Sequence, residues 1–157
     1  MMAAPYDARL IAQWFLAWTQ LEDEAALSNL KLQKLLYYAQ GHYMATHDGK
    51  PLFSDEIQAW AHGPVVPAVY HDYKQYGSGP IAFDGEFDFD SIDEDAGSWL
   101  GAVWDSFGSR TAWKLREMTH QESPWVSSFD PYGRGATITR ESMMQYFGGL
   151  YAGARAI

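Results

Sequence analysis

The densest run of hydrophobic positions in the chain lies at 27–49 and repeats with the period of an α-helix. One stripe of this predicted helix, with spacings of four, three and four, consists of Leu32, Leu36, Ala39 and Tyr43. Ser28 is a suitable N-cap, and Asp48–Gly49 can end the helix with a left-handed turn. Because positions outside the stripe are also apolar or aromatic, other elements should surround this helix. We therefore predict a central helix over 28–47 with its stripe buried.

Five further helices are predicted from the same periodicity. They occupy 5–22, 66–77, 94–107, 109–121 and 139–149. Pro5 fits the first turn of the first helix, whose stripe contains two Trp that we expect to pack on the central helix. Ser109 and Thr139 are the expected N-caps of the last two helices, and Gly148–Gly149 is the expected end of the final one. The fold class predicted is mainly α, a single compact domain over 1–157 with about six helices and a minor β element.

Polar and apolar residues alternate at 56–60, which predicts a short strand. Gly63–Pro64 should end this strand and turn the chain sharply into the next helix, with Gly63 in a backbone conformation costly for other residues. The stretch 78–96 is rich in Gly and acidic residues, and its phenylalanines hint at a small hairpin. Its acids do not have the spacing of a calcium loop, so we interpret it as a solvated loop that places negative charge near the next helix. A second loop is expected at 127–136.

Composition and charge narrow the possible functions. The aromatic share is 16%, with seven Trp and ten Tyr, and such residues serve both cores and protein interfaces. The net charge of −9 works against non-specific binding to nucleic acid or to anionic membranes, and would suit a partner with a basic surface. The absence of cysteine excludes disulfides and thiolate metal sites. With no signal-peptide pattern and no apolar run of about 18 residues, we expect a cytoplasmic protein without a membrane span.

Candidate catalytic groups are few. The histidines are His42, His47, His62, His71 and His120. The sequence contains no HExxH motif, nucleophile elbow, phosphate-binding loop or dinucleotide fingerprint. The segment 119–122 could hold an acid/base pair at a helix end, but a helix-terminal histidine more often caps or packs. We predict no catalytic, metal-binding or cofactor-binding residues and no enzyme. An enzyme that uses His120, Glu122 or His71 with a metal remains the alternative from a different class.

Polar residues begin the most hydrophobic helix of the chain. Lys34 and Tyr38 are four residues apart and therefore neighbours on its surface. They could simply keep the exposed side of the helix hydrated. Alternatively, they could form a mixed polar and aromatic face that docks a partner. The residues that we predict for partner binding are Lys31, Lys34, Tyr38, Trp60 and Tyr70.

Three blocks of sequence, in order between 27 and 125, resemble a known family. They read LSNLKLQKLLYYAQGHYMA, then GKPLFSDEIQAWAHGPVVPAVYHDYKQYG, then LREMTHQESPW. The chain resembles the Panacea domain family, which includes GepA-like phage-associated proteins and SocA-like antitoxins. The family motif falls here on Leu32, Gln33, Lys34, Leu35, Tyr37, Tyr38, Gly41, Trp60, Gly63, Pro64, Val65, Tyr70, Thr119, His120, Pro124 and Trp125. The resemblance does not include the first helix or the acidic stretch before residue 96.

The resemblance implies a mostly helical antitoxin that neutralises a cognate toxin protein by direct binding. It also implies an alternative, in which the protein is an adaptor that delivers its toxin to a ClpXP-type protease. The family has no established catalytic residues, and its toxin partners are diverse, so the resemblance names neither the toxin nor the oligomeric state. A DNA-binding autorepressor is a further alternative, against which the lack of a basic stripe argues.

Overall fold

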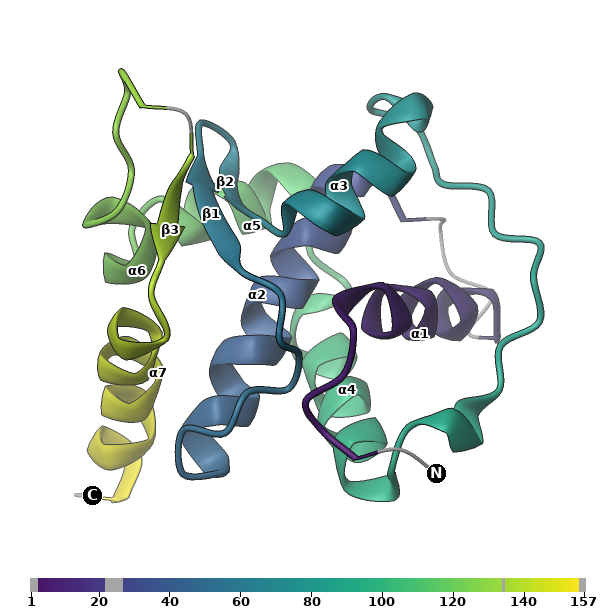
Figure 1. Cartoon of the computed structure of the whole chain (residues 1–157), viewed down its shortest axis with the longest axis horizontal. Helices are drawn as coiled ribbons and strands as arrows, with labels where there is room; N and C mark the ends of the chain where they lie inside the picture. Colours follow the sequence, from purple (N-terminus) through teal and green to yellow (C-terminus); the bar gives the residue numbers. More distant parts are fainter. Residues whose placement is uncertain (1–2, 22–26, 134, 156–157) are drawn as a thin grey trace.

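A computed structural model describes residues 3–21, 27–133 and 135–155, and its fold is mainly helical (Figure 1). The α-helices are α1 (Ala8–Leu21), α2 (Asn29–Thr46), α3 (Pro67–Tyr73), α4 (Glu94–Phe107), α5 (Ala112–Thr119), α6 (Ser123–Val126) and α7 (Arg140–Arg155). The strands are β1 (Ile57–Trp60), β2 (Gly63–Val65) and β3 (Ala136–Ile138), and two short 3₁₀ helices are η1 (Lys74–Tyr76) and η2 (Phe89–Ser91). The predicted fold class, mainly α with a minor β element, is confirmed.

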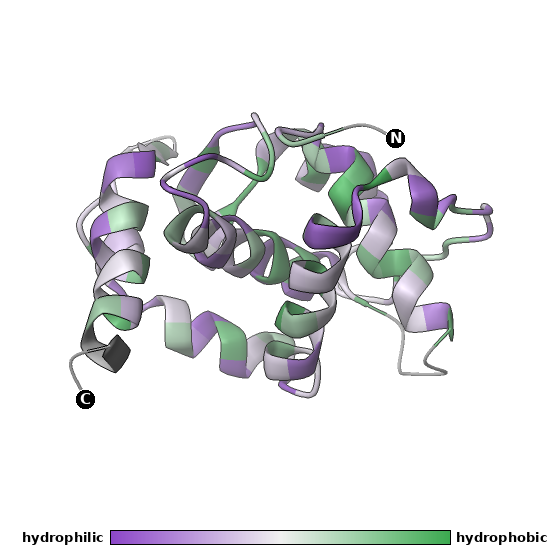
Figure 2. Ribbon diagram, turned by 90° about the horizontal axis from the view of Figure 1, so that it is seen from below, coloured by the Kyte–Doolittle hydropathy of each residue, from purple (hydrophilic) through white to green (hydrophobic). Residues whose placement is uncertain are grey.

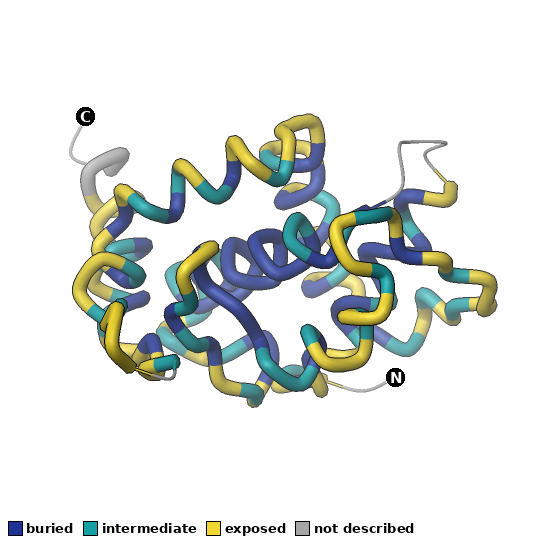
Figure 3. Tube along the Cα trace, turned by 90° about the horizontal axis from the view of Figure 1, so that it is seen from above, coloured by how far each residue is buried: buried dark blue, intermediate teal, exposed yellow. Residues whose placement is uncertain are grey.

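Helix α2 is the central element, as the hydrophobic pattern predicts. It packs against α1, α3, α4, α5, α7 and β2. The predicted stripe is buried, with 0% exposure for Leu32 and Leu36. The Ser28 hydroxyl accepts a hydrogen bond from the Lys31 amide at 3.2 Å, which confirms the N-cap. Figure 3 shows α2 buried along most of its length, because neighbouring helices cover it on several sides.

The helices around α2 have one packed and one exposed side. Figure 2 shows hydrophobic and hydrophilic residues mixed along them, which is typical of amphipathic helices at a surface. Two phenylalanines illustrate the packing, since Phe15 of α1 and Phe147 of α7 are both 0% exposed. The core therefore extends on both sides of α2.

The small sheet differs from the prediction in two ways. Its strand order is β2-β1-β3, and both pairings are antiparallel. Gly63–Pro64 does not end a strand but begins β2, which pairs back on β1 before the chain enters α3. Gly63 has φ +111°, as expected for a position that favours glycine. The predicted loop at 127–136 is wrong at its end, because β3 begins there and pairs with β1.

Several predicted helix boundaries are wrong. Helix α1 begins at Ala8, so Pro5 lies outside its first turn, and residue 22 of the predicted helix is outside the described residues. Helix α5 is capped by Thr111, whose hydroxyl accepts from the Lys114 amide at 3.0 Å, and not by Ser109. The Thr139 cap of α7 is confirmed by a 3.1 Å bond to the Ser142 amide.

Helix extends beyond the predicted bounds at two places that contain glycine or proline. Helix α7 does not end at Gly148–Gly149 but continues to Arg155. The chain at 123–126, between the predicted helix at 109–121 and the predicted loop at 127–136, forms the short helix α6 with Pro124 in its first turn. In the acidic stretch 78–96 the structure has η2 and no hairpin. Its Asp93 caps α4 through the Ala96 amide at 2.8 Å.

Candidate functional site

Polar side chains of α2 hold the extended chain that follows it. The Gln33 side-chain oxygen accepts a hydrogen bond from the Val66 amide at 2.9 Å. Gln40 bonds both ways, accepting from the Leu52 amide at 2.8 Å and donating to the Phe53 carbonyl at 2.9 Å. Both glutamines are buried, so they satisfy backbone groups that water cannot reach. Gln33, a position of the family motif, and Gln40, which is not one, therefore both have structural roles.

Lys34 is enclosed, which contradicts its predicted place on the surface. Its side chain is 0% exposed, and its ammonium group donates to the Pro64 carbonyl at 3.2 Å. Burial, with a smaller effect from Arg116, lowers the pKa of Lys34 to about 7. A Cβ at Gly63 would lie 2.5 Å from the Lys34 Cε, so the glycine makes room for the lysine. Lys34→Glu should consequently damage the fold, whereas a surface position would tolerate it.

Tyr38 is also buried, at 2% exposure, and its predicted role as an exposed neighbour of Lys34 is wrong. Its hydroxyl donates to one carboxylate oxygen of Glu122 at 2.8 Å, and the Tyr37 hydroxyl donates to the other at 3.0 Å. Its ring stacks on Phe107 of α4 with centroids 4.1 Å apart. Burial raises the pKa of Glu122, while the hydrogen bonds from tyrosine hydroxyls partly offset that shift. The two hydrogen bonds to Glu122 hold α2 against the α5–α6 connection.

His120 and Glu122, the candidate acid/base groups at 119–122, make contacts with different partners. The His120 ring stacks on Trp125 with centroids 3.9 Å apart, and the Trp125 indole donates to the Trp60 carbonyl at 2.8 Å. Burial lowers the pKa of His120, so its imidazole is favoured in the neutral form. In the described structure no hydrogen bond joins His120 to Glu122. The three sequence blocks therefore lie together in the structure. Their contacts are packing and hydrogen bonds that hold α2, β2 and α5–α6 together, and not a catalytic arrangement.

The aromatic residues predicted for binding lie beside a groove. Trp60 and Tyr70 are partly exposed, and their rings meet edge to face with centroids 4.8 Å apart. They line an apolar depression of about 540 Å³ together with Leu30, Val65 and Trp113. Trp113 of α5 is 56% exposed, which is unusual for so large an apolar side chain. The depression is within the size range of ligand and peptide pockets.

A second depression of about 670 Å³ adjoins the first, because Ser78 lines both. Lys31 and Arg110 are its charged lining residues. The Lys31 ammonium donates to the Gly108 carbonyl at 2.5 Å and lies 5.5 Å from the centre of the Trp104 ring. Lys31 is thus held by the wall of the groove at a partly exposed position, close to where the sequence placed it.

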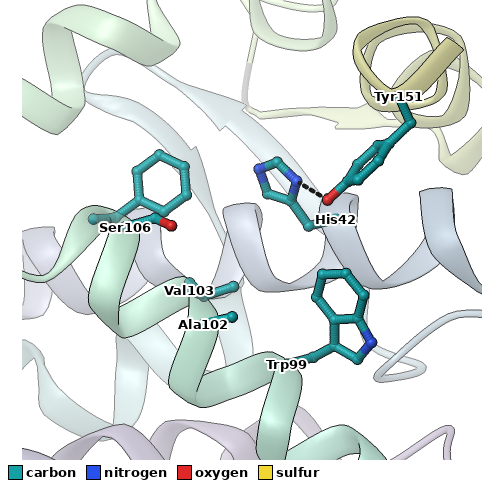
Figure 4. A pocket seen from close by; sticks show the side chains of 7 residues that line it. His42, Trp99, Ala102, Val103, Ser106 and Tyr151 are labelled. Atoms are coloured by element: carbon teal, nitrogen blue, oxygen red, sulfur yellow. Dashed lines mark hydrogen bonds between the residues drawn. The ribbon is translucent and has the colours of Figure 1, made fainter. Parts of the chain in front are cut away.

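A smaller cavity lies between α2, α4 and α7 (Figure 4). Its volume is about 120 Å³, below the roughly 300–1,000 Å³ of typical small-molecule sites. His42 and Tyr151 face each other across one side, with 2.9 Å between Nδ1 and the hydroxyl oxygen. Burial lowers the pKa of His42. We interpret this cavity as a packing defect between helices that this hydrogen bond spans.

The described residues contain neither a candidate metal-binding cluster nor a helix that could span a membrane. No group of three or more His, Asp or Glu side chains in 3–21, 27–133 and 135–155 is placed to hold a metal ion. Across the same residues, every helix is too short or too polar to cross a membrane.

Sequence reasoning missed Trp113, the most exposed aromatic residue of the groove. A signal was available, because the apolar stripe of α5 runs through Leu115 and Met118 and leaves Trp113 off it. No sequence pattern identifies Ser78, the residue that lines both depressions. Its position depends on how the 77–80 turn packs against α2 and α5.

Comparisons with known proteins agree with the sequence blocks. A family model described as Antitoxin SocA-like, Panacea domain matches residues 32–126, from the start of α2 to the end of α6. Antitoxin SocA of Caulobacter vibrioides (strain NA1000 / CB15N) is 41% identical over an alignment of 76 residues that covers 45% of this chain. The alignment spans 37% of that relative's length, well under two thirds of it. No solved structure matches the chain.

Proposed function

The chain belongs to the SocA-like, Panacea domain family of antitoxins, and we propose that it neutralises a cognate toxin by binding it directly. The observation that carries this proposal is the family match over 32–126. The relative that aligns with part of the chain is itself named an antitoxin. A toxin partner is therefore the first expectation for this protein, and a cytoplasmic encounter is consistent with the absence of cysteine.

The groove is the surface that we propose for toxin contact. Large aromatic side chains concentrate binding energy at interfaces, and Trp60, Tyr70 and Trp113 are gathered here. Lys31 stays in the proposed surface as a partly exposed charge at the adjoining depression. Lys34 and Tyr38 are not proposed to contact the toxin, because they are buried. They support the surface by holding α2 against β2 and α5–α6.

We infer that neutralisation is stoichiometric and needs no catalysis or cofactor. Two groups that could carry acid/base chemistry make structural hydrogen bonds instead. Glu122 accepts from two tyrosine hydroxyls, and Lys34 donates to a backbone carbonyl. The net charge of −9 also favours a protein partner over a nucleic acid.

Co-expression with the product of the neighbouring reading frame tests this function. The antitoxin proposal predicts that the neighbouring product arrests growth alone and that this protein restores growth. Failure to restore growth at matched expression levels would contradict the proposal. Immunoblots of the toxin separate the two mechanisms: direct blocking leaves the toxin level unchanged, whereas an adaptor lowers it only when a ClpXP-type protease is present.

A further inference from the structure

The two depressions form one surface, which we call the joined groove. Its apolar half is lined by Leu30, Trp60, Val65, Tyr70 and Trp113, and its basic half by Lys31, Trp104 and Arg110. Ser78 lies where the halves meet. The start of α2 contributes one residue to each half, Leu30 to the apolar half and Lys31 to the basic half. A bound segment would therefore pass from apolar to basic surroundings within a few residues.

The apolar half is ready to receive a large side chain. Trp113 is 56% exposed, yet the Arg116 guanidinium lies 4.4 Å from the centre of its ring. Such a cation–π contact restrains an exposed indole and lowers the entropy lost on binding. Trp60 and Tyr70 meet edge to face on the same side of the groove. An aromatic or large aliphatic side chain of a partner would pack against these rings.

The charge of the groove is opposite to that of the protein. The chain has 20 acidic residues against 11 Lys and Arg. Among the described residues that line the joined groove there is nonetheless no Asp or Glu, whereas Lys31 and Arg110 are present. Arg110 is exposed, and within the described residues its guanidinium makes a single long hydrogen bond, 3.5 Å from Nε to the Ser106 carbonyl. A groove of this kind attracts a local negative charge although the whole surface repels one.

We propose that the joined groove binds one extended segment of the toxin, in which a large apolar side chain is followed within a few residues by acidic side chains. The apolar side chain enters the half with Trp60, Tyr70 and Trp113, and the acidic residues lie over Arg110 and Lys31. This inference rests on the proposed function, and it adds the chemistry of the segment that the toxin presents. It replaces the expectation, drawn from net charge alone, of a basic contact surface on the partner.

Binding of the purified toxin from the neighbouring reading frame to the full chain tests the proposal. The groove variants are Trp113→Ala and Arg110→Glu, which remove the aromatic anchor and reverse the exposed charge. The matched controls are Tyr132→Ala, an aromatic residue that is 96% exposed, and Lys50→Glu, an exposed charge beyond the end of α2. We expect each groove variant to weaken binding by roughly tenfold or more and each control to bind like the wild type. Wild-type affinity should also fall with added salt, and less steeply for Arg110→Glu.

The outcomes separate this proposal from the proposed function. Wild-type binding that both groove variants retain overturns the groove and leaves the antitoxin function standing. Equal weakening by Arg110→Glu and Lys50→Glu overturns the local charge argument in favour of net charge. A wild-type protein that does not bind the toxin overturns both proposals.

Two further measurements test what occupies the groove. If light scattering shows that the protein self-associates and that Trp113→Ala abolishes this self-association, a second copy of the chain and not the toxin occupies the groove. Circular dichroism of each variant confirms its fold, and restored binding of Arg110→Glu to a toxin with one acidic residue changed to Lys confirms the pairing.

Discussion

At the scale of single residues, Lys34 is the side chain whose environment departs furthest from what its type suggests. It is 0% exposed, donates to the Pro64 carbonyl, and in the described structure has no carboxylate within ion-pair distance. The sequence could not show this, because a lysine near the start of a helix usually stays in water. The only hint was that α2 is apolar on most sides and offers few exposed positions. What encloses the lysine is Gly63, which comes from a different element.

The burial of Lys34 should make stability depend on pH. Its pKa is about 7 in the native protein against 10.5 normally, so between these values the unfolded chain binds the extra proton. Stability contributed by this group is therefore lowest below pH 7 and rises towards pH 10.5, by up to about 1.4 kcal/mol per pH unit. Urea unfolding of the wild type and Lys34→Met from pH 6 to 9 measures this. We expect the wild type to gain stability relative to the variant as pH rises, and a constant difference would contradict the burial of a titrating amine.

Gly63 should tolerate no side chain. Its φ of +111° disfavours other residues, and a Cβ would lie 2.5 Å from Lys34 Cε and 2.9 Å from Thr119 Oγ1. We expect Gly63→Ala to lower the free energy of unfolding by about 1–3 kcal/mol. The control is Gly97→Ala in α4, where a Cβ meets nothing within 4 Å and alanine should be neutral or stabilising by up to about 1 kcal/mol. Equal effects of the two substitutions in urea unfolding would refute the argument from backbone and space.

At the scale of elements, the sequence predicts what depends on neighbours along the chain. Helix α2 and its Ser28 cap follow from local periodicity and capping, and α4 begins and ends as predicted. Strand β3 was missed because it is three residues long and its partner β1 lies far away in sequence. Thr111 rather than Ser109 caps α5, and both are residue types that can cap a helix. Of the candidate site, Trp60 and Tyr70 were predicted at one surface, whereas the groove needed the three-dimensional packing of α2, α3 and α5.

The contact between α2 and α7 depends on the absence of a side chain at Gly41. A Cβ there would lie 2.2–2.6 Å from three ring atoms of Phe147, which is 0% exposed. We expect Gly41→Ala to lower the free energy of unfolding by about 1–3 kcal/mol through overpacking. Phe147→Leu alone should also destabilise by leaving a cavity, but the double variant should be more stable than the sum of both costs predicts. Additive effects in urea unfolding would show that the two positions are not in contact.

At the scale of the whole molecule, the high aromatic content serves two purposes that composition alone could not separate. Trp14 is 3% exposed and stacks on Trp18 with centroids 4.9 Å apart, within the packing of α1. Trp113 is 56% exposed beside the groove. The charges divide in a similar way, since the acidic residues that give the net charge of −9 are absent from the described lining of the joined groove. The protein thus combines an acidic net charge with an apolar and basic lining of the joined groove among the described residues.

Calorimetric titration of the two purified proteins measures whether this protein neutralises a toxin by the direct contact that we propose. The titration uses the full chain and the product of the neighbouring reading frame, with no protease or nucleic acid present. Direct neutralisation predicts saturable binding at a fixed ratio, together with loss of toxin activity in the same mixture at that ratio. Rescue of growth in cells without measurable binding of the two purified proteins would contradict it.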